Sequence, residues 1–536
     1  MSASFDLAVL GSGFAGSLLA MIARRLGRSV VLLERGRHPR FVIGESSTPL
    51  ANLLWEELAL RYDLPRLAPL AKWGAWQRTY PQIGCGLKRG FTFYHHAFGQ
   101  RFGADPDRCD QLLVAASPHD AIADTHWYRP DFDHFLVREA AALGVEYFDE
   151  TKLGSVQFDA GGATLTGERA GQLLRVHARF ILDASGQRGA LHRALALPEQ
   201  SFEHLPATHA LFSHFSGVRR MDELADFQRS GATQPGSGSE IPPYPVDDAA
   251  VHHVFDGGWI WVLRFNNGLT SAGGAATSAL AEELRFAEGA PAWDRLLARL
   301  PSVRAQFAGA EAVLPFVHLP RLSFRSGVAV GEGWALVPSA AGFVDPLLST
   351  GFPLTLLGIS RLAGAIEQLW NPLRFRAELD HYAKQTLAEL DATALLIAAL
   401  YASMKDFEVF AAFSLLYFAA ASFSETARRL GRPELAGSFL LQDDPRFGPE
   451  LRACCHQALA AASAGRLPAQ SKRDLLARIA RAIEPFDVAG LTNAARRNWH
   501  PVDAQDLFNA APKLGVSAAE IEALLARCGF YPESRR

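Results

Sequence analysis

The sequence is poor in several features that mark common classes of protein. Its 536 residues include five cysteines, an odd number without metal-ligand spacing, which predicts no bound metal and favours a reducing cytoplasm over a disulfide framework. The net charge is -3 without a long run of like charge, so nucleic acid is not expected as a partner. Two apolar stretches, 394–402 and 410–420, are each shorter than the ~20 residues of a membrane span, and we expect buried helices there.

A glycine fingerprint near the start of the chain predicts a bound dinucleotide. Residues 6–10 are expected to form a buried strand, and a Gly-x-Gly-x-x-Gly turn and an apolar helix follow directly. The first glycine permits the tight turn, the second lets backbone amides approach a pyrophosphate, and the third lets the helix pack closely. A second strand, 30–33, ends in an acid that takes the ribose hydroxyls. The predicted contacts are Gly11, Gly13, Ala15, Gly16, Glu34 and Arg35.

Three later segments indicate which dinucleotide is bound. Residues 38–49, 180–186 and 331–351 resemble, in this order, the segments that contact FAD in flavin monooxygenases. A second glycine fingerprint for a nicotinamide is missing from the sequence, so a separate flavin reductase is expected to supply FADH2. The FAD contacts that the resemblance adds are Arg40, Glu45, Ser46, Asp183, Gly186, Asp345 and Pro346.

Lys88 is the candidate catalytic residue. If 85–93 forms one strand, Lys88 faces away from Phe91 and Phe93 and points alone into a cavity. A second aromatic strand places Trp259 and Trp261 on one face, although tryptophans so spaced are more often part of a core. These four aromatic residues are the candidate walls of a substrate pocket.

Together these motifs resemble those of the flavin-dependent halogenases, and most closely the branch that acts on free phenols. The shared segments are 44–46, 85–93, 258–267 and 342–351. The resemblance implies that Lys88 is essential and that a halide ion binds the backbone at Thr350 and Gly351 beside the flavin. Hypohalous acid would then reach Lys88. The lysine could hydrogen-bond the acid as an ammonium, or it could carry the halogen as a haloamine. Burial lowers the pKa of a lysine and so favours the haloamine.

Two departures from the family pattern bear on the substrate. Arg264 replaces the proline of the family's Trp-x-Trp-x-Ile-Pro motif, and Leu348 replaces a glutamate that tryptophan halogenases carry beside Ser-Thr-Gly. A small, electron-rich phenol needs less activation and is the expected substrate. The altered motif leaves open an FAD-dependent hydroxylase that acts on an aromatic molecule or on a tryptophan of a partner protein. A non-catalytic flavoprotein or an isoprenoid reductase is a third alternative.

The expected fold class is α/β, with a Rossmann-type FAD-binding domain interleaved with a mostly antiparallel substrate-binding sheet, and a helical C-terminal region. The FAD-binding part is predicted to span 1–370, with the substrate sheet mainly at 80–130 and 200–325, and the helical region 371–536. Residues 230–243, rich in glycine, proline and serine, are expected to form an irregular loop. The early fingerprint leaves no room for a cleaved signal, which predicts a cytoplasmic protein. The sequence gives no indication of the oligomeric state.

Overall fold

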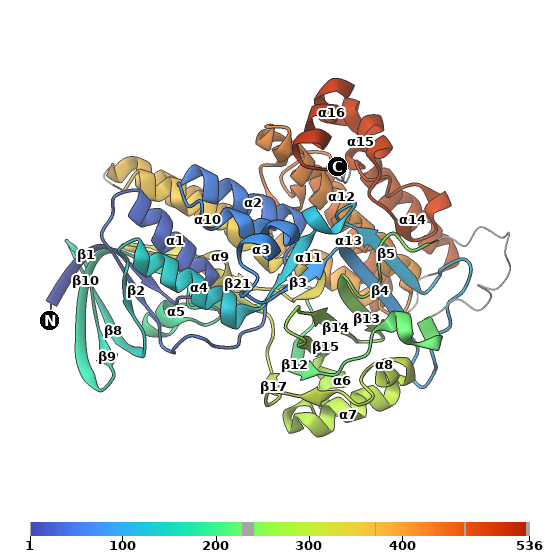
Figure 1. Ribbon diagram of the computed structural model, residues 1–536, viewed down its shortest axis with the longest axis horizontal. Helices are drawn as coiled ribbons and strands as arrows, with labels where there is room; N and C mark the ends of the chain where they lie inside the picture. Colours follow the sequence, from blue (N-terminus) through green and yellow to red (C-terminus); the bar gives the residue numbers. More distant parts are fainter. Residues whose placement is uncertain (1, 228–240, 370, 466–467, 532–536) are drawn as a thin grey trace.

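The computed structural model describes residues 2–227, 241–369, 371–465 and 468–531 (Figure 1). Most of the segment expected to be an irregular loop, 230–240, lies outside these residues. The protein has the predicted α/β fold, built on two large sheets. In Figure 1 the sheet formed by the N-terminal strands lies at one end of the molecule, and the second sheet lies beside the C-terminal helices.

The first sheet carries the glycine fingerprint. Its order is β19-β20-β10-β1-β2-β7, and β20, β10, β1, β2 and β7 run parallel. β2 is buried along its whole length, as expected of a parallel strand covered on both faces. Helix α1 (Phe14–Arg25) packs against β1, α4 (Arg129–Ala142) and α10 (Gly351–Glu367). The strands are β1 (Ser2–Leu10), β2 (Val30–Leu33), β7 (Glu146–Phe148), β10 (Gln172–Asp183), β19 (Val330–Gly331) and β20 (Trp334–Leu336), with β8 (Thr151–Asp159) and β9 (Gly162–Arg169) attached to β10.

The second sheet has the order β16-β12-β15-β14-β13-β4-β5-β22, and β17 also pairs with β12. Its neighbours are antiparallel except for two parallel pairs, β13 with β4 and β22 with β5. The strands are β4 (Gly90–His96), β5 (Gln111–Ala115), β12 (Thr208–Ser216), β13 (Ala250–Phe255), β14 (Gly258–Arg264), β15 (Thr270–Thr277), β16 (Glu311–Ala312), β17 (Val317–Leu319) and β22 (Trp499–His500). One face packs on α6 (Ser278–Glu283), α7 (Ala290–Arg299) and α8 (Pro301–Gln306).

The segment 85–93 is two strands and not one. β3 (Cys85–Lys88) pairs with β6 (Asp124–Trp127) in a small sheet of its own, whereas β4 belongs to the second large sheet. Arg89 lies between them, and its backbone N–H and C=O bond to Asp248 and Ala116, each at 2.7 Å. The expected alternation is therefore wrong, because the chain turns at Arg89 and brings Lys88 and Phe91 together.

Apolar helices form the rest of the core. Among the residues that the structure describes, three segments are long and apolar enough to cross a membrane, 347–367, 372–403 and 407–429, and 67–72% of their most apolar windows is buried. α11 packs against α10, α12 and α13, so their apolar surfaces cover one another. These helices are α2 (Pro49–Arg61), α3 (Trp73–Thr79), α5 (Ala190–Ala194), α9 (Pro338–Ala341), α11 (Pro372–Ser403), α12 (Phe407–Arg429), α13 (Phe447–Ser463), α14 (Ala469–Ile483), α15 (Ala504–Ala510) and α16 (Ala518–Arg527); a small sheet joins β11 (Glu199–Gln200), β18 (Phe324–Ser326) and β21 (Gly342–Phe343).

Candidate active site

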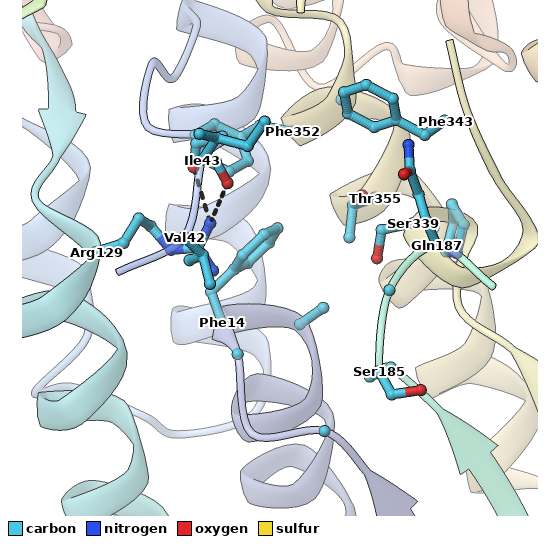
Figure 2. A pocket seen from close by; sticks show the side chains of 18 of the residues that line it. Phe14, Val42, Ile43, Arg129, Ser185, Gln187, Ser339, Phe343, Phe352 and Thr355 are labelled. Atoms are coloured by element: carbon cyan, nitrogen blue, oxygen red, sulfur yellow. Dashed lines mark hydrogen bonds between the residues drawn. The ribbon is translucent and has the colours of Figure 1, made fainter. Parts of the chain in front are cut away.

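A cavity of about 840 Å³, here called the outer cavity, opens beside the carboxyl ends of β1, β2 and β10 (Figure 2). Ligands of doubly wound α/β proteins bind at this edge of the sheet. Figure 2 shows Phe14 and Arg129 on one side of the cavity and Ser185 and Gln187 on the other. The predicted residues that line it are Gly11, Gly13, Ala15, Glu34, Arg35, Arg40, Glu45, Ser46, Gly186, Trp259, Trp261, Asp345, Pro346, Thr350 and Gly351.

The glycine turn has the geometry that a dinucleotide requires. Gly11 has a φ of +91°, and a Cβ there would lie 2.7 Å from the carbonyl oxygen of Ala184. A Cβ on Gly16 would lie 1.9 Å from the carbonyl oxygen of Gly11, so no larger residue fits between α1 and the turn. Gly16 is not part of the cavity wall, and its role is to let α1 pack closely against the turn.

Glu34 holds the turn from the end of β2. Its carboxylate accepts hydrogen bonds from the backbone N–H groups of Ser12 at 2.9 Å and Gly36 at 2.8 Å, and it pairs with Arg40 at 3.3 Å. Burial raises the pKa of this carboxyl, but the Arg40 charge and the N–H donors outweigh burial and lower it. The carboxylate is thus ionised beside the cavity.

Arg129 anchors the segment before Glu45, and sequence reasoning missed it. Its guanidinium forms a bidentate ion pair with Asp133, with both contacts at 2.8 Å, and both side chains are buried. It also donates to the carbonyl oxygens of Gly44 at 2.8 Å and Ile43 at 3.5 Å, the dashed lines in Figure 2. The motif between residues 38 and 49 is therefore fixed from α4, by a residue more than 80 positions away.

Asp183 acts on its own loop and does not reach the cavity wall. Its buried carboxylate accepts hydrogen bonds from Ser185 N at 2.9 Å, Ser185 Oγ at 2.5 Å and Leu191 N at 2.7 Å. Gly186, with a φ of +83°, lines the cavity in the loop that Asp183 holds. Because these three donors surround the carboxylate, Asp183 positions the loop, and its predicted contact with the cofactor stays a prediction.

Asp345 belongs to a buried polar cluster that joins its own loop to α11. Its carboxylate accepts hydrogen bonds from Leu347 N at 2.9 Å and from Tyr401 on α11 at 3.0 Å. Burial raises its pKa to about 7, against the lowering effect of these hydrogen bonds. Asp345 therefore connects the outer cavity to α11.

Lys88 lies in the wall between the outer cavity and a second, smaller one. The second cavity, here called the inner cavity, has a volume of about 190 Å³ and is enclosed by β4, β5, α12 and residues 488–530. Lys88 is fully buried; its Nζ donates to Ser46 Oγ at 2.9 Å and to the carbonyl oxygen of Ser47 at 2.5 Å. The same Nζ lies 3.8 Å from the ring centroid of Phe91. Ser46 lines the outer cavity and Phe91 the inner one, so Lys88 contacts both walls without lining either cavity.

The electrostatics around Lys88 lower its pKa to about 7, which raises the fraction of neutral amine at neutral pH. Burial lowers the pKa of Lys88, and the nearby Asp124 opposes this effect. His252, which lines the outer cavity, has its pKa lowered to about 3 by burial and by the charge of Lys88. Its Nδ1 donates to the carbonyl oxygen of Ala250 at 2.9 Å, so the imidazole is neutral with the proton on that nitrogen.

The four predicted pocket aromatics are distributed over two cavities and the wall between them. Phe91 lines the inner cavity, Trp259 and Trp261 line the outer one, and Phe93 is buried between the two. His252 joins the set, with ring centroids 4.4 Å from Phe93 and 5.2 Å from Trp259. The structure therefore brings these residues together as a row of rings across β4, β13 and β14.

The remaining predicted positions concern halide and the altered tryptophan motif. Thr350 and Gly351 line the outer cavity at the N-terminus of α10, where a helix dipole favours an anion. Leu348, with a φ of 63°, is fully buried. Arg264, which replaces the family's proline, pairs with Asp247 at 3.0 Å. That arginine is a structural anchor at the end of β14 and is not part of either cavity wall.

Comparisons with known proteins identify the family. The family model described as tryptophan halogenase matches residues 123–410, more than half of the chain. The chain is also 30% identical over 419 residues to monodechloroaminopyrrolnitrin halogenase PrnC of Pseudomonas fluorescens, covering 77% of this chain and 70% of that relative. The chain belongs to the flavin-dependent halogenase family. It is therefore an FAD-dependent halogenase, an oxidoreductase whose cofactor is FAD, as the sequence predicted.

Two further relatives show how far the likeness extends. Tetracycline 7-halogenase of Kitasatospora aureofaciens is 30% identical over 369 residues, which cover 67% of this chain and 62% of that enzyme. The crystal structure of halogenase PltM with phloroglucinol and FAD superposes with a TM-score of 0.78 at 24% identity, covering 92% of this chain and 99% of PltM. At that identity the superposition shows a shared fold. The glycine turn, Glu34 and the helix N-terminus at Thr350 all lie on the wall of the outer cavity, and their chemistry fits a dinucleotide cofactor.

Proposed function

We propose that this protein halogenates a small, phenol-like aromatic with FADH2, O2 and halide, through hypohalous acid relayed to Lys88. The observation that carries the proposal is the place of Lys88 between two cavities, with Ser46 on the outer wall and Phe91 on the inner wall. A lysine in this place can meet a halogen from one side and an aromatic ring from the other.

The relay assigns a task to each side of the wall. Bound reduced FAD, with O2 and halide, supplies hypohalous acid in the outer cavity, where backbone N–H groups at Thr350 and Gly351 would hold the halide. Neutral His252 adds no competing positive charge there. The lowered pKa of Lys88 favours the neutral amine, which can carry the halogen as a haloamine. Phe91 then provides the surface on which the aromatic ring lies opposite the halogen.

The inner cavity favours a single aromatic ring as substrate. A cavity of about 150 Å³ lined by Leu, Ile and Phe holds benzene, and the inner cavity has about 190 Å³. Its wall is largely apolar, with Phe91, Val114 and Phe418 among the residues that line it. PltM, which shares the fold, has been solved with phloroglucinol, itself a single-ring phenol. Leu348 supports the same class, because a phenol needs no extra carboxylate at that position.

The remaining parts of the proposal concern supply and location. We infer a separate, diffusing flavin reductase because the sequence carries one glycine fingerprint. Glu34 holds the turn of that fingerprint, which we assign to FAD, so no second fingerprint is left for a nicotinamide. A cytoplasmic location belongs to the same proposal, since a reductase and reduced nicotinamide are available there.

The product formed from bromide tests the proposal. The FAD-loaded protein is incubated with a flavin reductase, NADH, O2, bromide and a panel of phenols and indoles, and products are analysed by mass spectrometry. We expect the bromine isotope doublet on single-ring phenols, and its loss in Lys88→Ala with FAD still bound. Oxygenated products without bromine, formed equally by Lys88→Ala, would identify a hydroxylase and refute the proposal.

A further inference from the structure

Asp124 is a buried carboxylate in the wall of the inner cavity, and the relay gives it no role. It begins β6, and its Cα partner in the antiparallel pairing with β3 is Lys88. Its Oδ1 accepts a hydrogen bond from Asn52 Nδ2 at 2.8 Å, and Ser47 Oγ donates to Asn52 Oδ1 at 2.8 Å. Its Oδ2 is buried without a hydrogen-bond partner among the described residues.

An unpartnered carboxylate oxygen at this place indicates a ligand. Burying an acceptor without a donor destabilises a fold, so proteins normally supply one. Here Lys88, directly across the sheet, donates to Ser46 and Ser47 and forms no ion pair with Asp124 among the described contacts. Asn52 is held by Ser47 and serves Oδ1 only. A molecule that fills the cavity can supply the missing donor.

We propose that Asp124 Oδ2 binds the ring hydroxyl of the aromatic substrate and takes its proton during halogenation. The inference rests on the proposed function and adds the group that selects phenols. Side chains paired across an antiparallel ladder have Cβ atoms roughly 5 Å apart, so a hydroxyl held by Asp124 brings the ring close to Lys88.

The atoms and electrons of the step balance. Hypohalous acid first exchanges its halogen for a proton of the neutral Lys88 amine, which gives the haloamine and water. An electron pair of the ring then forms the carbon–halogen bond, and the nitrogen–halogen bond breaks with its pair on nitrogen. The hydroxyl proton passes through Asp124 to that nitrogen, which restores the amine and leaves a halogenated dienone. The ring proton then passes to Asp124 and on to the oxygen, which restores aromaticity. The sum is ArH plus HOX giving ArX plus water.

The charges around Asp124 suit a base. Burial raises the pKa of Asp124, and Glu425 on α12 adds to this effect. Lys88, the hydrogen bond from Asn52, and Arg429 on α12 act in the opposite direction. A carboxylate whose pKa is raised accepts a phenolic proton more readily than an ordinary one does. Phenol binding and turnover should therefore fall as the pH drops and Asp124 becomes protonated.

Binding of matched ligands tests the proposal without turnover. Phenol and fluorobenzene have nearly the same shape, but only phenol donates a hydrogen bond. Their affinities for the oxidised, FAD-loaded protein are measured by calorimetry without halide or reductant. We expect phenol to bind roughly 10- to 100-fold more tightly, as for a hydrogen bond to a charged group. In Asp124→Asn, which keeps the contact with Asn52, the ratio should fall to within about threefold, and the pH dependence should disappear.

The control variant is Asp120→Asn. Asp120 is a nearby carboxylate whose side chain is 59% exposed and pairs with Arg89. It should keep the wild-type ratio. Equal wild-type affinities for phenol and fluorobenzene, or an unchanged ratio in Asp124→Asn with FAD and circular dichroism intact, would overturn the inference.

Product analysis separates the two proposals. If the wild type hydroxylates phenol but the ligand ratio still depends on Asp124, halogenation fails and the binding role stands. If the wild type halogenates phenol and Asp124→Asn does so with the same kcat/KM and pH profile, the role of Asp124 fails and halogenation stands.

Discussion

Replacing Arg129 should separate the stability of the fold from the affinity for FAD. Arg129→Met leaves Asp133, whose side chain is fully buried, as an unpaired charge. Breaking a buried ion pair from one side costs about 3–5 kcal/mol of unfolding free energy. The contacts with the carbonyl oxygens of Gly44 and Ile43 are lost as well, so the segment before Glu45 is no longer held against the outer cavity. We expect FAD affinity to fall about tenfold or more.

A second substitution isolates the charge effect. Asp133→Ala in the Arg129→Met background removes the orphaned carboxylate, so stability should return to within about 2 kcal/mol of the wild type. FAD affinity should stay low, because Gly44 still lacks its donor. Urea unfolding followed by circular dichroism gives the stability, and quenching of flavin fluorescence gives the affinity. Two results would contradict this role of Arg129. One is a loss of less than about 1 kcal/mol of unfolding free energy in Arg129→Met, and the other is recovery of both stability and FAD affinity in the double variant.

Three further predictions follow from single positions. Gly16→Ala should yield protein without yellow FAD, measured by its absorbance, because the new Cβ would lie 1.9 Å from the Gly11 carbonyl oxygen. Burial raises the pKa of Asp345 to about 7, so the ionised carboxylate destabilises the fold increasingly as the pH rises from about 4 to 7. In urea unfolding, Asp345→Asn should therefore stabilise the FAD-free protein by a few kcal/mol at pH 8 and by little at pH 4.5. His252, with its pKa lowered to about 3, should remain neutral at pH 5 by imidazole ¹⁵N NMR, assigned with His252→Gln.

The parts of the site that the sequence predicted each lie in a short local motif. The turn from Gly11 to Gly16 and the acid at Glu34 follow from glycine spacing and one short strand, because local sterics determine them. Lys88 was predicted from its neighbours, but its orientation was not, since the break at Arg89 depends on hydrogen bonds to Asp248 and Ala116.

The missed residues come from elsewhere in the sequence. Arg129, Asp124 and Tyr401 carry no local motif, and each acts on a partner more than 30 positions away. No pattern in residues 488–530 indicated that the C-terminal region closes the inner cavity. Burial and pairing, which follow only from the tertiary fold, identify these residues.

Following the oxidised halogen itself tests whether Lys88 transfers it between the two cavities. Lys88→Met keeps the length and volume of the side chain, and it is loaded with FAD and supplied with reductase, NADH, O2 and bromide. Released hypobromous acid is trapped with a thioether scavenger, while brominated phenol is quantified in parallel. We expect scavenger oxidation to continue at the wild-type rate and bromophenol to fall at least about 1000-fold. Bromophenol formed at the wild-type rate by Lys88→Met would contradict the account.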